Sequence, residues 1–393
     1  MKKNLFSKIT KTVLSNYDFS LVTLVLFLSA FGLLMIFSAS SFRAQYYYGD
    51  AYLYIKRQGI FLVGGIVLMI ITSLIDYEVY GKKMKLLHVR PVIILYLICL
   101  GLHLYVFFAG YSANGSSRWI QLGGGFNLQP SEISKVCFVL GGAFVIDRKK
   151  RLINTGRTLK NFLGVIFIFV LSAPILMLVA VQNLSSAVIL GGILACLIFV
   201  VSRDKKGFLL AMIIPIIVGI FMIYAKGYRS ERLTHFLDPE TMDSADQIMQ
   251  GLFAIAYGGL FGRGLGNSVQ KLGNMPEVHT DMIFTIICEE LGIIGGIAVI
   301  GLFLLLLWRI FMIALKAPDL YGALIAIGVF SQVAIQVIMN IAVVTNSMPA
   351  TGVPLPFISY GGSNLMILMA EMGIVLNVSK KTYTPIPDVE DEE

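Results

Sequence analysis

The chain has 393 residues, of which 57% are hydrophobic and 14% are charged, and its mean hydropathy is +0.81. A water-soluble domain needs roughly a quarter of its residues charged to cover its surface, so this composition excludes a soluble enzyme, a disordered chain and a disulfide-stapled secreted scaffold. It predicts a protein embedded in a lipid bilayer, in which the formal net charge of +8 takes its meaning from where the cations lie relative to the membrane.

Ten apolar runs are long enough to cross the ~30 Å hydrocarbon core, which takes about 20 residues of α-helix. They begin near Phe19, Gly59, Val92, Glu132, Phe162, Leu184, Phe208, Met282, Tyr321 and Asn364. Stretches such as 92–100 and 297–307 are continuously apolar, whereas strands of a membrane barrel alternate apolar and polar residues. We therefore predict an all-α polytopic membrane protein of about ten transmembrane helices, with one domain over residues 19–381 after a short segment, 1–18.

The positive charges indicate the orientation of these helices. If the amino terminus is cytoplasmic, 21 of the 31 Lys and Arg residues fall in connections on the cytoplasmic side. Both termini are then cytoplasmic, and the net charge is explained by anionic lipid headgroups without any nucleic-acid partner. The first apolar run, 21–37, is long for a cleaved signal peptide and is expected to be a retained anchor. The acidic, proline-containing tail, 382–393, is expected to be a disordered cytoplasmic end.

The first polar segment of interest, NGSSRWIQLGGGFNLQPSEISK (114–135), precedes the fourth run. Pro130 suits the first turn of a helix, where the helix dipole stabilises the negative charge of Glu132. Lys135 lies three residues later on the same helical face, so each charge lowers the cost of placing the other near the membrane. The two residues can form an interhelical ion pair, contact a substrate, or do both. Trp119 is expected to be an interfacial aromatic anchor.

The longest connection, 226–281, lies on the outer face in this orientation. It is rich in acidic residues: Glu231, Asp238, Glu240, Asp243, Asp246, Glu277 and Asp281. Within it the segment GLFAIAYGGLFGRGLG (251–266) is apolar, glycine-rich and short for a crossing. We expect a re-entrant or interfacial segment packed on the bundle; the alternative is a surface helix with a glycine hinge.

This connection enters the eighth run through MPEVHTDMIFTIICEELG (275–292). Asp281 lies at the water–lipid boundary shortly after Glu277 and His279, where partial burial and a neighbouring carboxylate would suit a general base. An Asp before an apolar run is also the expected N-cap of a helix, and from the spacing alone capping is the stronger interpretation. Glu289 and Glu290 lie two turns deeper and are expected to be paired within the bundle.

The last connection, SMPATGVPLPFISYGGSN (347–364), contains three prolines, three glycines and no charge. Its irregular backbone must pack against protein or line a cavity, and its amides could hold an anionic group. Elsewhere the four cysteines all lie within apolar runs, which predicts neither disulfides nor a metal site. Motifs of nucleotide-driven pumps, zinc proteases and serine hydrolases are absent from the sequence, which argues against those classes.

Four of these segments together resemble the SEDS family of bacterial cell-envelope proteins, the FtsW, RodA and SpoVE group. The matching stretches are SSRWIQLGGGFNLQPSEISK, GGLFGRGLGNSVQKLGNMPEVHTDMIF, CEELG and TGVPLPFISYGGSN. The resemblance covers residues 19–381 and is closer to the division and sporulation members than to the elongation members. It implies a peptidoglycan glycosyltransferase that polymerises lipid II at the outer face of the cytoplasmic membrane. A class B penicillin-binding protein would supply transpeptidation, alongside other membrane proteins of the division or elongation complexes.

The resemblance also assigns site residues. The essential acid of the family falls on Asp281, and its Glu and Lys pair falls on Glu132 and Lys135. Further signature positions fall on Arg118 and on residues 356–363, within which we expect substrate contacts, as at Glu277 and His279. The candidates in that loop are Ser359, Gly361, Gly362 and Ser363.

The sequence departs from the family pattern at two of its motif positions. Asn183 stands where many members have an acid, and Met282 replaces a common Phe. If the acid matters to activity elsewhere in the family, a neutral amide must fill its role here, or the role is lost.

Lipid II carries its own leaving group, a pyrophosphate on the anomeric carbon, so the chemistry requires no nucleotide cofactor. In our hypothesis Asp281 is the general base for the acceptor hydroxyl, while Lys135, with Arg118 as a further candidate, supports the diphosphate. Glu132 would orient Lys135 or help to bind a divalent cation, Mg or Mn, although no metal site is predicted from ligand spacing. Residues 251–266 would help to form the groove for the lipid and sugar.

Two other functions compete with this one. A lipid II flippase would also suit ten spans and broken helices, although its polar residues should continue through the middle of the membrane. A non-catalytic scaffold of the division complex gains some support from Asn183.

Overall fold

All ten predicted apolar runs are helices in the computed structural model of the chain. It describes residues 17–84, 88–113, 116–121, 127–224, 236, 247–272 and 278–383. The long helices are α2 (Phe19–Tyr48), α3 (Leu53–Leu74), α5 (Pro91–Ala109), α6 (Pro130–Lys149), α7 (Thr158–Gln182), α8 (Leu184–Val201), α9 (Lys205–Tyr224), α12 (Ile283–Lys316), α13 (Leu320–Val344) and α14 (Gly362–Tyr383). Shorter helices are α4 (Glu78–Gly81), α11 (Gln247–Gly258) and the 3-10 turn η2 (Gln270–Leu272).

Nine helices in the described ranges are long and apolar enough to cross a membrane, and α6 differs from them only in composition. Its 20 residues include five charged ones: Glu132, Lys135, Asp147, Arg148 and Lys149. With α6 counted, the structure agrees with the prediction of about ten spans, and the protein is a multi-pass membrane protein. The predicted starts are correct to within a few residues except that of α3, which begins six residues early, at Leu53.

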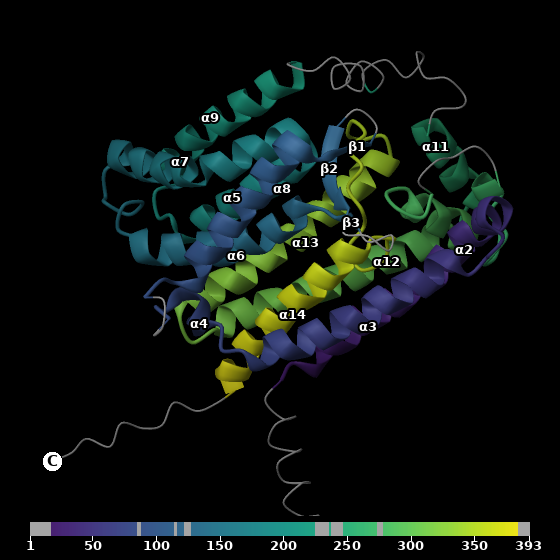
Figure 1. Cartoon of the computed structure of the whole chain (residues 1–393), viewed down its shortest axis with the longest axis horizontal. Coiled ribbons are helices and arrows are strands. Elements are labelled where there is room, and N and C mark those ends of the chain that lie inside the picture. The colour runs from purple at the N-terminus through teal and green to yellow at the C-terminus, as the bar shows by residue number, and fades with distance from the viewer. Residues whose placement is uncertain are drawn as a thin grey trace, which may run out of the picture.

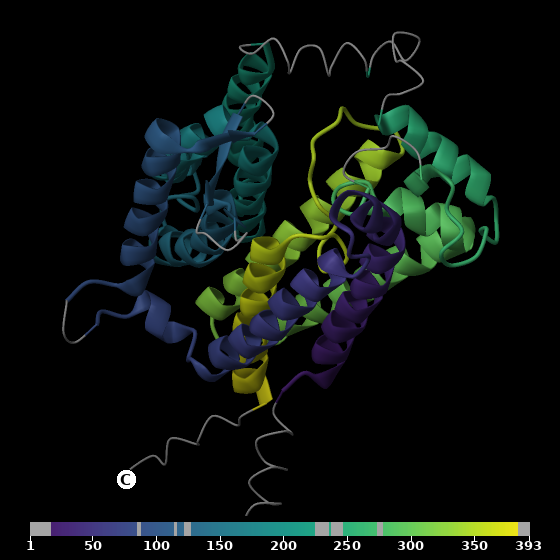
Figure 2. The same ribbon diagram turned by 45° about the vertical axis from the view of Figure 1, so that its right-hand side comes forward.

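Helix α13 lies at the centre of the bundle. It packs against α6 and α8 on one side and α12 on the other, while α14 runs along α3. Figure 2 shows α5 to α9 grouped on one side, with α2, α11 and α12 on the other and α13 and α14 between them. The membrane-crossing windows of α13 and α14 are 72% buried, against 17% for α9, so the outer helices present their apolar side chains to lipid.

The start of α2 and the end of α14 meet at one end of the bundle (Figure 1). Asp18 caps α2 by accepting from the Leu21 N–H (3.0 Å), pairs with Arg309, and donates its own N–H to Ser379 Oγ (3.4 Å). With α6 counted, the long helices of the described residues are even in number, which agrees with these two helix ends lying on one face of the bundle. Residues 1–16 and 384–393, which include most of both predicted terminal segments, lie outside the described residues.

The segment before α6, which we had interpreted only as a loop, contains a small antiparallel sheet in the order β1–β2–β3. The strands are Tyr111–Ala113, Ser116–Gln121 and Asn127–Leu128, with Tyr111 opposite Trp119 and Ile120 opposite Leu128. The strands are too short for an apolar alternation to show in the sequence. The sheet lies beside the beginning of α6 and carries Arg118 on its middle strand.

Candidate functional site

The glycine-rich segment 251–266 packs against a break in α12, as expected. Gly292 has a positive φ of 73° and interrupts the helix, which leaves backbone groups without their helical partners. Four backbone hydrogen bonds to the segment replace them. The N–H groups of Arg263 and Gly264 donate to Glu289 O (3.0 Å) and Glu290 O (2.9 Å). The N–H groups of Ile293 and Ile294 donate to Gly259 O (2.9 Å) and Leu260 O (3.3 Å). Side chains at Gly258, Gly262 or Gly292 would collide with this facing backbone, which explains the glycines.

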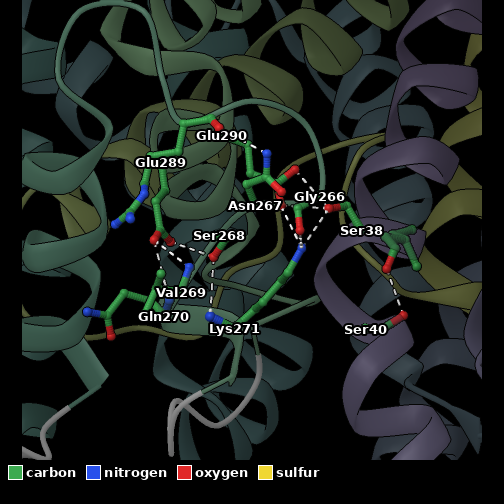
Figure 3. A network of polar contacts seen from close by, with 12 residues as sticks. Ser38, Ser40, Gly266, Asn267, Ser268, Val269, Gln270, Lys271, Glu289 and Glu290 are labelled. Atoms are coloured by element: carbon green, nitrogen blue, oxygen red, sulfur yellow. Dashed lines mark hydrogen bonds and ion pairs between the residues drawn. The ribbon is translucent and has the colours of Figure 1, made fainter.

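Buried polar contacts also fix the stretch that follows this segment, residues 268–271, to α12 (Figure 3). Glu289 accepts from the Ser268 hydroxyl and from the Val269 N–H (2.7 Å). Glu290 pairs with Lys271 (2.9 Å) and accepts from Ser38 Oγ of α2 (2.6 Å). Both carboxylates are fully buried, so the prediction that they are paired within the bundle is confirmed. They anchor residues 268–271 of the long connection, which precede Asp281 in the sequence.

Asp281 does not cap α12. The helix begins at Ile283, and its N-cap residue is Met282, which makes no capping hydrogen bond, so the interpretation of Asp281 as the cap is wrong. Its half-buried carboxylate accepts instead from Gln247 Nε2 of α11 (3.4 Å) and from Thr280 Oγ1 (3.2 Å). The carboxylate is therefore held at the junction of α11 and α12, where it keeps some access to solvent.

Asn340 of α13 ties Asp281 to the last connection. Its amide donates to Asp281 O and to Val353 O, both at 2.8 Å. A Cβ placed on Gly352, whose φ is +64°, would lie 3.5 Å from Asp281 Oδ2, so the backbone of this loop passes directly beside the carboxylate. A Cβ would be in ordinary contact at this distance, but any side chain at Gly352 would strain the backbone because of the positive φ.

His279 holds the other end of the Asp281 turn. Its backbone oxygen accepts from the Tyr360 N–H (2.8 Å), and its ring lies 4.3 Å from the Tyr54 ring and 5.3 Å from the Tyr360 ring, measured between centroids. Burial raises the pKa of the Tyr360 hydroxyl above its usual value, although the Arg57 guanidinium opposes this effect. Glu277, the other predicted contact in this segment, lies outside the described residues.

The loop positions expected to contact substrate are engaged within the protein. Ser359 is buried, and its hydroxyl accepts from the Leu355 N–H (2.8 Å). The amides of Ser359, Tyr360 and Gly361 donate to Leu355 O, His279 O and Gln58 Oε1. These three amides are therefore not free to hold an anion. Gly362 packs on the Phe61 ring, and Ser363 Oγ donates to Asn127 O (2.8 Å).

The predicted ion pair at the start of α6 is confirmed. Pro130 occupies the first turn, Glu132 and Lys135 are 5% and 2% exposed, and Lys135 Nζ lies 2.8 Å from both carboxylate oxygens. Arg118 of β2 is half-buried nearby, and its Nε donates to Gln182 O at the end of α7 (3.1 Å). The arrangement places two cations at the same end of the bundle as Asp281.

Asn183, the position where the family acid is missing, is the N-cap of α8. Its side chain accepts from the N–H groups of Ser185 (3.1 Å) and Ser186 (3.4 Å). Ser185 Oγ in turn donates to Thr351 O (3.0 Å), next to Gly352. The amide thus performs a capping role beside the loop that passes Asp281.

A buried carboxyl that we did not single out from the sequence, Glu371 of α14, also faces this region. It is 1% exposed and accepts from Gln332 Nε2 of α13 (2.7 Å), and the charges of Glu132 and Lys135 act on it. Gln332, Gln336 and Asn340 follow one face of α13 at intervals of four residues. That spacing was visible in the sequence, but it was hidden within an apolar run.

Within the described ranges, no three or more His, Cys, Asp or Glu side chains converge as metal ligands. Lys135 Nζ lies 2.8 Å from both carboxylate oxygens of Glu132, so the positive charge of the lysine would oppose a divalent cation at this carboxylate.

Comparison with known proteins identifies the family. The sequence profile of the FtsW, RodA and SpoVE group, described as "Cell cycle protein", matches residues 19–384. This chain belongs to the FtsW/RodA/SpoVE family. Stage V sporulation protein E of Bacillus subtilis is 38% identical over 368 residues, covering 92% of this chain and 97% of that protein. A probable peptidoglycan glycosyltransferase FtsW of Geobacter metallireducens is 35% identical over 383 residues, covering 96% and 98%.

Solved structures share the FtsW/RodA/SpoVE fold of this chain. One chain of a peptidoglycan synthase complex, described as coordinating polymerisation and crosslinking, superposes with a TM-score of 0.74 at 25% identity, covering 94% of this chain and 99% of that one. The rod shape determining protein RodA of Thermus thermophilus gives 0.67 at 24% identity, covering 94% and 98%. The helical bundle is therefore the fold of the family.

Proposed function

We propose that this protein is a peptidoglycan glycosyltransferase that polymerises lipid II at the outer face of the cytoplasmic membrane. Its relatives include proteins named as probable peptidoglycan glycosyltransferases, which match nearly their full length. The observation that carries the proposal is the half-buried Asp281 carboxylate, held by Gln247 and beside Gly352, at the bundle end that also carries Arg118 and Lys135.

In the proposed reaction the Asp281 carboxylate takes the proton from the acceptor sugar hydroxyl. The hydroxyl oxygen then forms a bond to the anomeric carbon of the donor as its bond to the pyrophosphate breaks. The leaving group departs as a lipid diphosphate anion, and nearby cations stabilise the charge that develops on it. Asp281 must return its proton to water before the next cycle, which its partial exposure allows.

Lys135 and Arg118 would supply that positive charge. Lys135 uses two of its three N–H groups on Glu132, so it would approach a diphosphate with the third or by leaving Glu132. Arg118 is held through Nε to Gln182 O, which fixes the direction of its guanidinium. Glu132 would keep Lys135 charged and oriented until substrate arrives.

The proposal includes a partner that crosslinks the new strands, a class B penicillin-binding protein. It is supported by the synthase complex with a similar chain, which coordinates polymerisation with crosslinking. Other membrane proteins of the division or elongation complexes would join the assembly. The distribution of Lys and Arg supports cytoplasmic termini and a site on the opposite, outer face.

Proteoliposomes that contain the purified protein, its partner and fluorescent lipid II test the reaction class. We expect glycan polymer to form from lipid II already in the accessible leaflet. Movement of lipid II between leaflets without polymer would contradict the proposal and favour a flippase. Neither polymer nor movement, with the partner still bound, would contradict it in favour of a scaffold.

A further inference from the structure

A histidine that the proposed chemistry does not use lies buried beside the α6 ion pair. His103 belongs to α5 and is 1% exposed, within a helix whose other residues are almost all apolar. An ionisable ring inside a membrane-spanning helix is costly unless its nitrogens find partners. Both ring nitrogens of His103 have one, and the two partners lie on different helices.

The hydrogen bonds define which nitrogen carries the proton. Gln182 Nε2 of α7 donates to His103 O (3.0 Å), which places Gln182 Oε1 against the ring at 2.9 Å from Nδ1. An amide oxygen only accepts, so Nδ1 carries the hydrogen, and the neutral ring accepts at Nε2 from Ser134 Oγ of α6 (2.8 Å). His103 therefore joins α7 to α6 through two directional bonds.

These two partners lead directly to the two cations of the site. Ser134 precedes Lys135 on α6, inside the turn that forms the pair with Glu132. Gln182 accepts from Arg118 through its backbone oxygen. A continuous path of hydrogen bonds and covalent bonds thus runs from Arg118 through Gln182, His103 and Ser134 to Lys135.

We propose that His103 is a positioning residue of the polymerase, which sets Arg118 and Lys135 at the separation needed to bind one diphosphate. This inference rests on the proposed function. Apolar packing between α5, α6 and α7 is non-directional and allows small rotations and shifts, whereas hydrogen bonds fix both. Charge stabilisation depends on placement to within about 0.5 Å, so this fixed geometry matters to the rate of reaction.

A purely structural role would also make the loss of His103 destabilising, so stability alone does not distinguish the two. The distinction lies in coupling to Arg118. If His103 acts by placing Arg118, then removing His103 from a variant that already lacks Arg118 should lower kcat little further. If His103 only fills space, the two reductions in kcat should multiply.

The test measures kcat and KM for lipid II polymerisation by the full chain with its partner, at a temperature where every variant is folded. The variants are His103→Ala, Ser134→Ala, His103→Gln and the control Val106→Ala, each alone and combined with Arg118→Lys. Val106 is fully buried one turn further along α5, so its truncation removes buried packing from the same helix without removing a side-chain hydrogen bond. Ser134→Ala removes the bond to Nε2, together with the longer contact of Ser134 Oγ with Pro130 O (3.3 Å), and keeps the helical backbone.

We expect His103→Ala to lower kcat by about 100-fold, the scale of a 1 Å misplacement, with KM changed by less than about threefold. Ser134→Ala should lower kcat in the same direction, and His103→Gln, which can donate and accept, should recover most of the rate. Combining His103→Ala with Arg118→Lys should reduce the rate less than about threefold below the worse single variant. For the control, the reductions in kcat caused by Val106→Ala and by Arg118→Lys should multiply.

Multiplying losses for His103→Ala and Arg118→Lys, as with the Val106 control, would overturn the positioning role and leave the proposed function intact. An unchanged kcat in both His103→Ala and Ser134→Ala would do the same. A wild-type protein that makes no polymer would overturn the proposed function and the positioning role together.

Discussion

Breaking the buried pair between Glu132 and Lys135 should destabilise the protein by an amount that the geometry sets. Lys135→Met leaves the 5% exposed Glu132 carboxylate without its cation, and Glu132→Gln leaves the 2% exposed Lys135 ammonium without its anion. Removing one partner of a buried ion pair typically costs roughly 3–5 kcal/mol, because the remaining charge is desolvated and uncompensated. Each single variant should therefore lose roughly that much free energy of unfolding.

Unfolding of the detergent-purified wild type and of the two single variants measures both losses. Single variants as stable as wild type would refute the reasoning.

The double variant Glu132→Gln with Lys135→Met separates the structural role from the chemical one. Removing both charges leaves neither unpaired, so most of the lost stability should return. Polymerisation should not return, because the diphosphate has lost Lys135. A double variant that polymerises lipid II at the wild-type rate would show that the pair is purely structural.

Two further predictions follow from local geometry. Gly292→Ala should destabilise the folded protein by at least about 2 kcal/mol, because the new Cβ would lie 2.2 Å from Leu260 O at a positive φ. The control Gly301→Ala, where a Cβ meets no atom within 4 Å, should be neutral or stabilising. Thermal unfolding compares the two variants. Hydrogen bonds from Lys381 and Lys82 lower the pKa of Glu78 in the folded protein, so Glu78 stabilises the protein above its unfolded-state pKa and loses this effect as pH falls through its folded-state pKa. Below pH 5 the wild type should therefore lose up to about 1 kcal/mol of unfolding free energy relative to Glu78→Gln. An equal pH dependence of stability in the two proteins would contradict the pairing.

Features that depend on local sequence were predictable. The spans follow from apolar runs of sufficient length, and the Glu132–Lys135 pair follows from a spacing of three within the first turn of a helix. The packing of 251–266 followed from its composition, since an apolar segment too short to cross must be covered by protein.

Contacts between distant segments were not predictable. His103 and Gln182 are 79 residues apart, and a single polar residue in an apolar run gives no sign of its partner. The capping interpretation of Asp281 failed because α12 begins one residue later than the capping pattern requires. The amides near Tyr360 proved to be engaged with His279 and Gln58, which only the folded chain brings together.

The most direct test of the account compares wild type with Asp281→Asn, each purified with its penicillin-binding partner and supplied with lipid II. Asn keeps the shape of the side chain and an oxygen that can accept from Gln247, so the unfolding temperatures should match. Because a general base contributes roughly 10²–10⁴-fold to a rate, we predict that glycan synthesis falls by at least about 100-fold. Glycan strands made equally well by the Asn variant would contradict the assignment of Asp281 as the base.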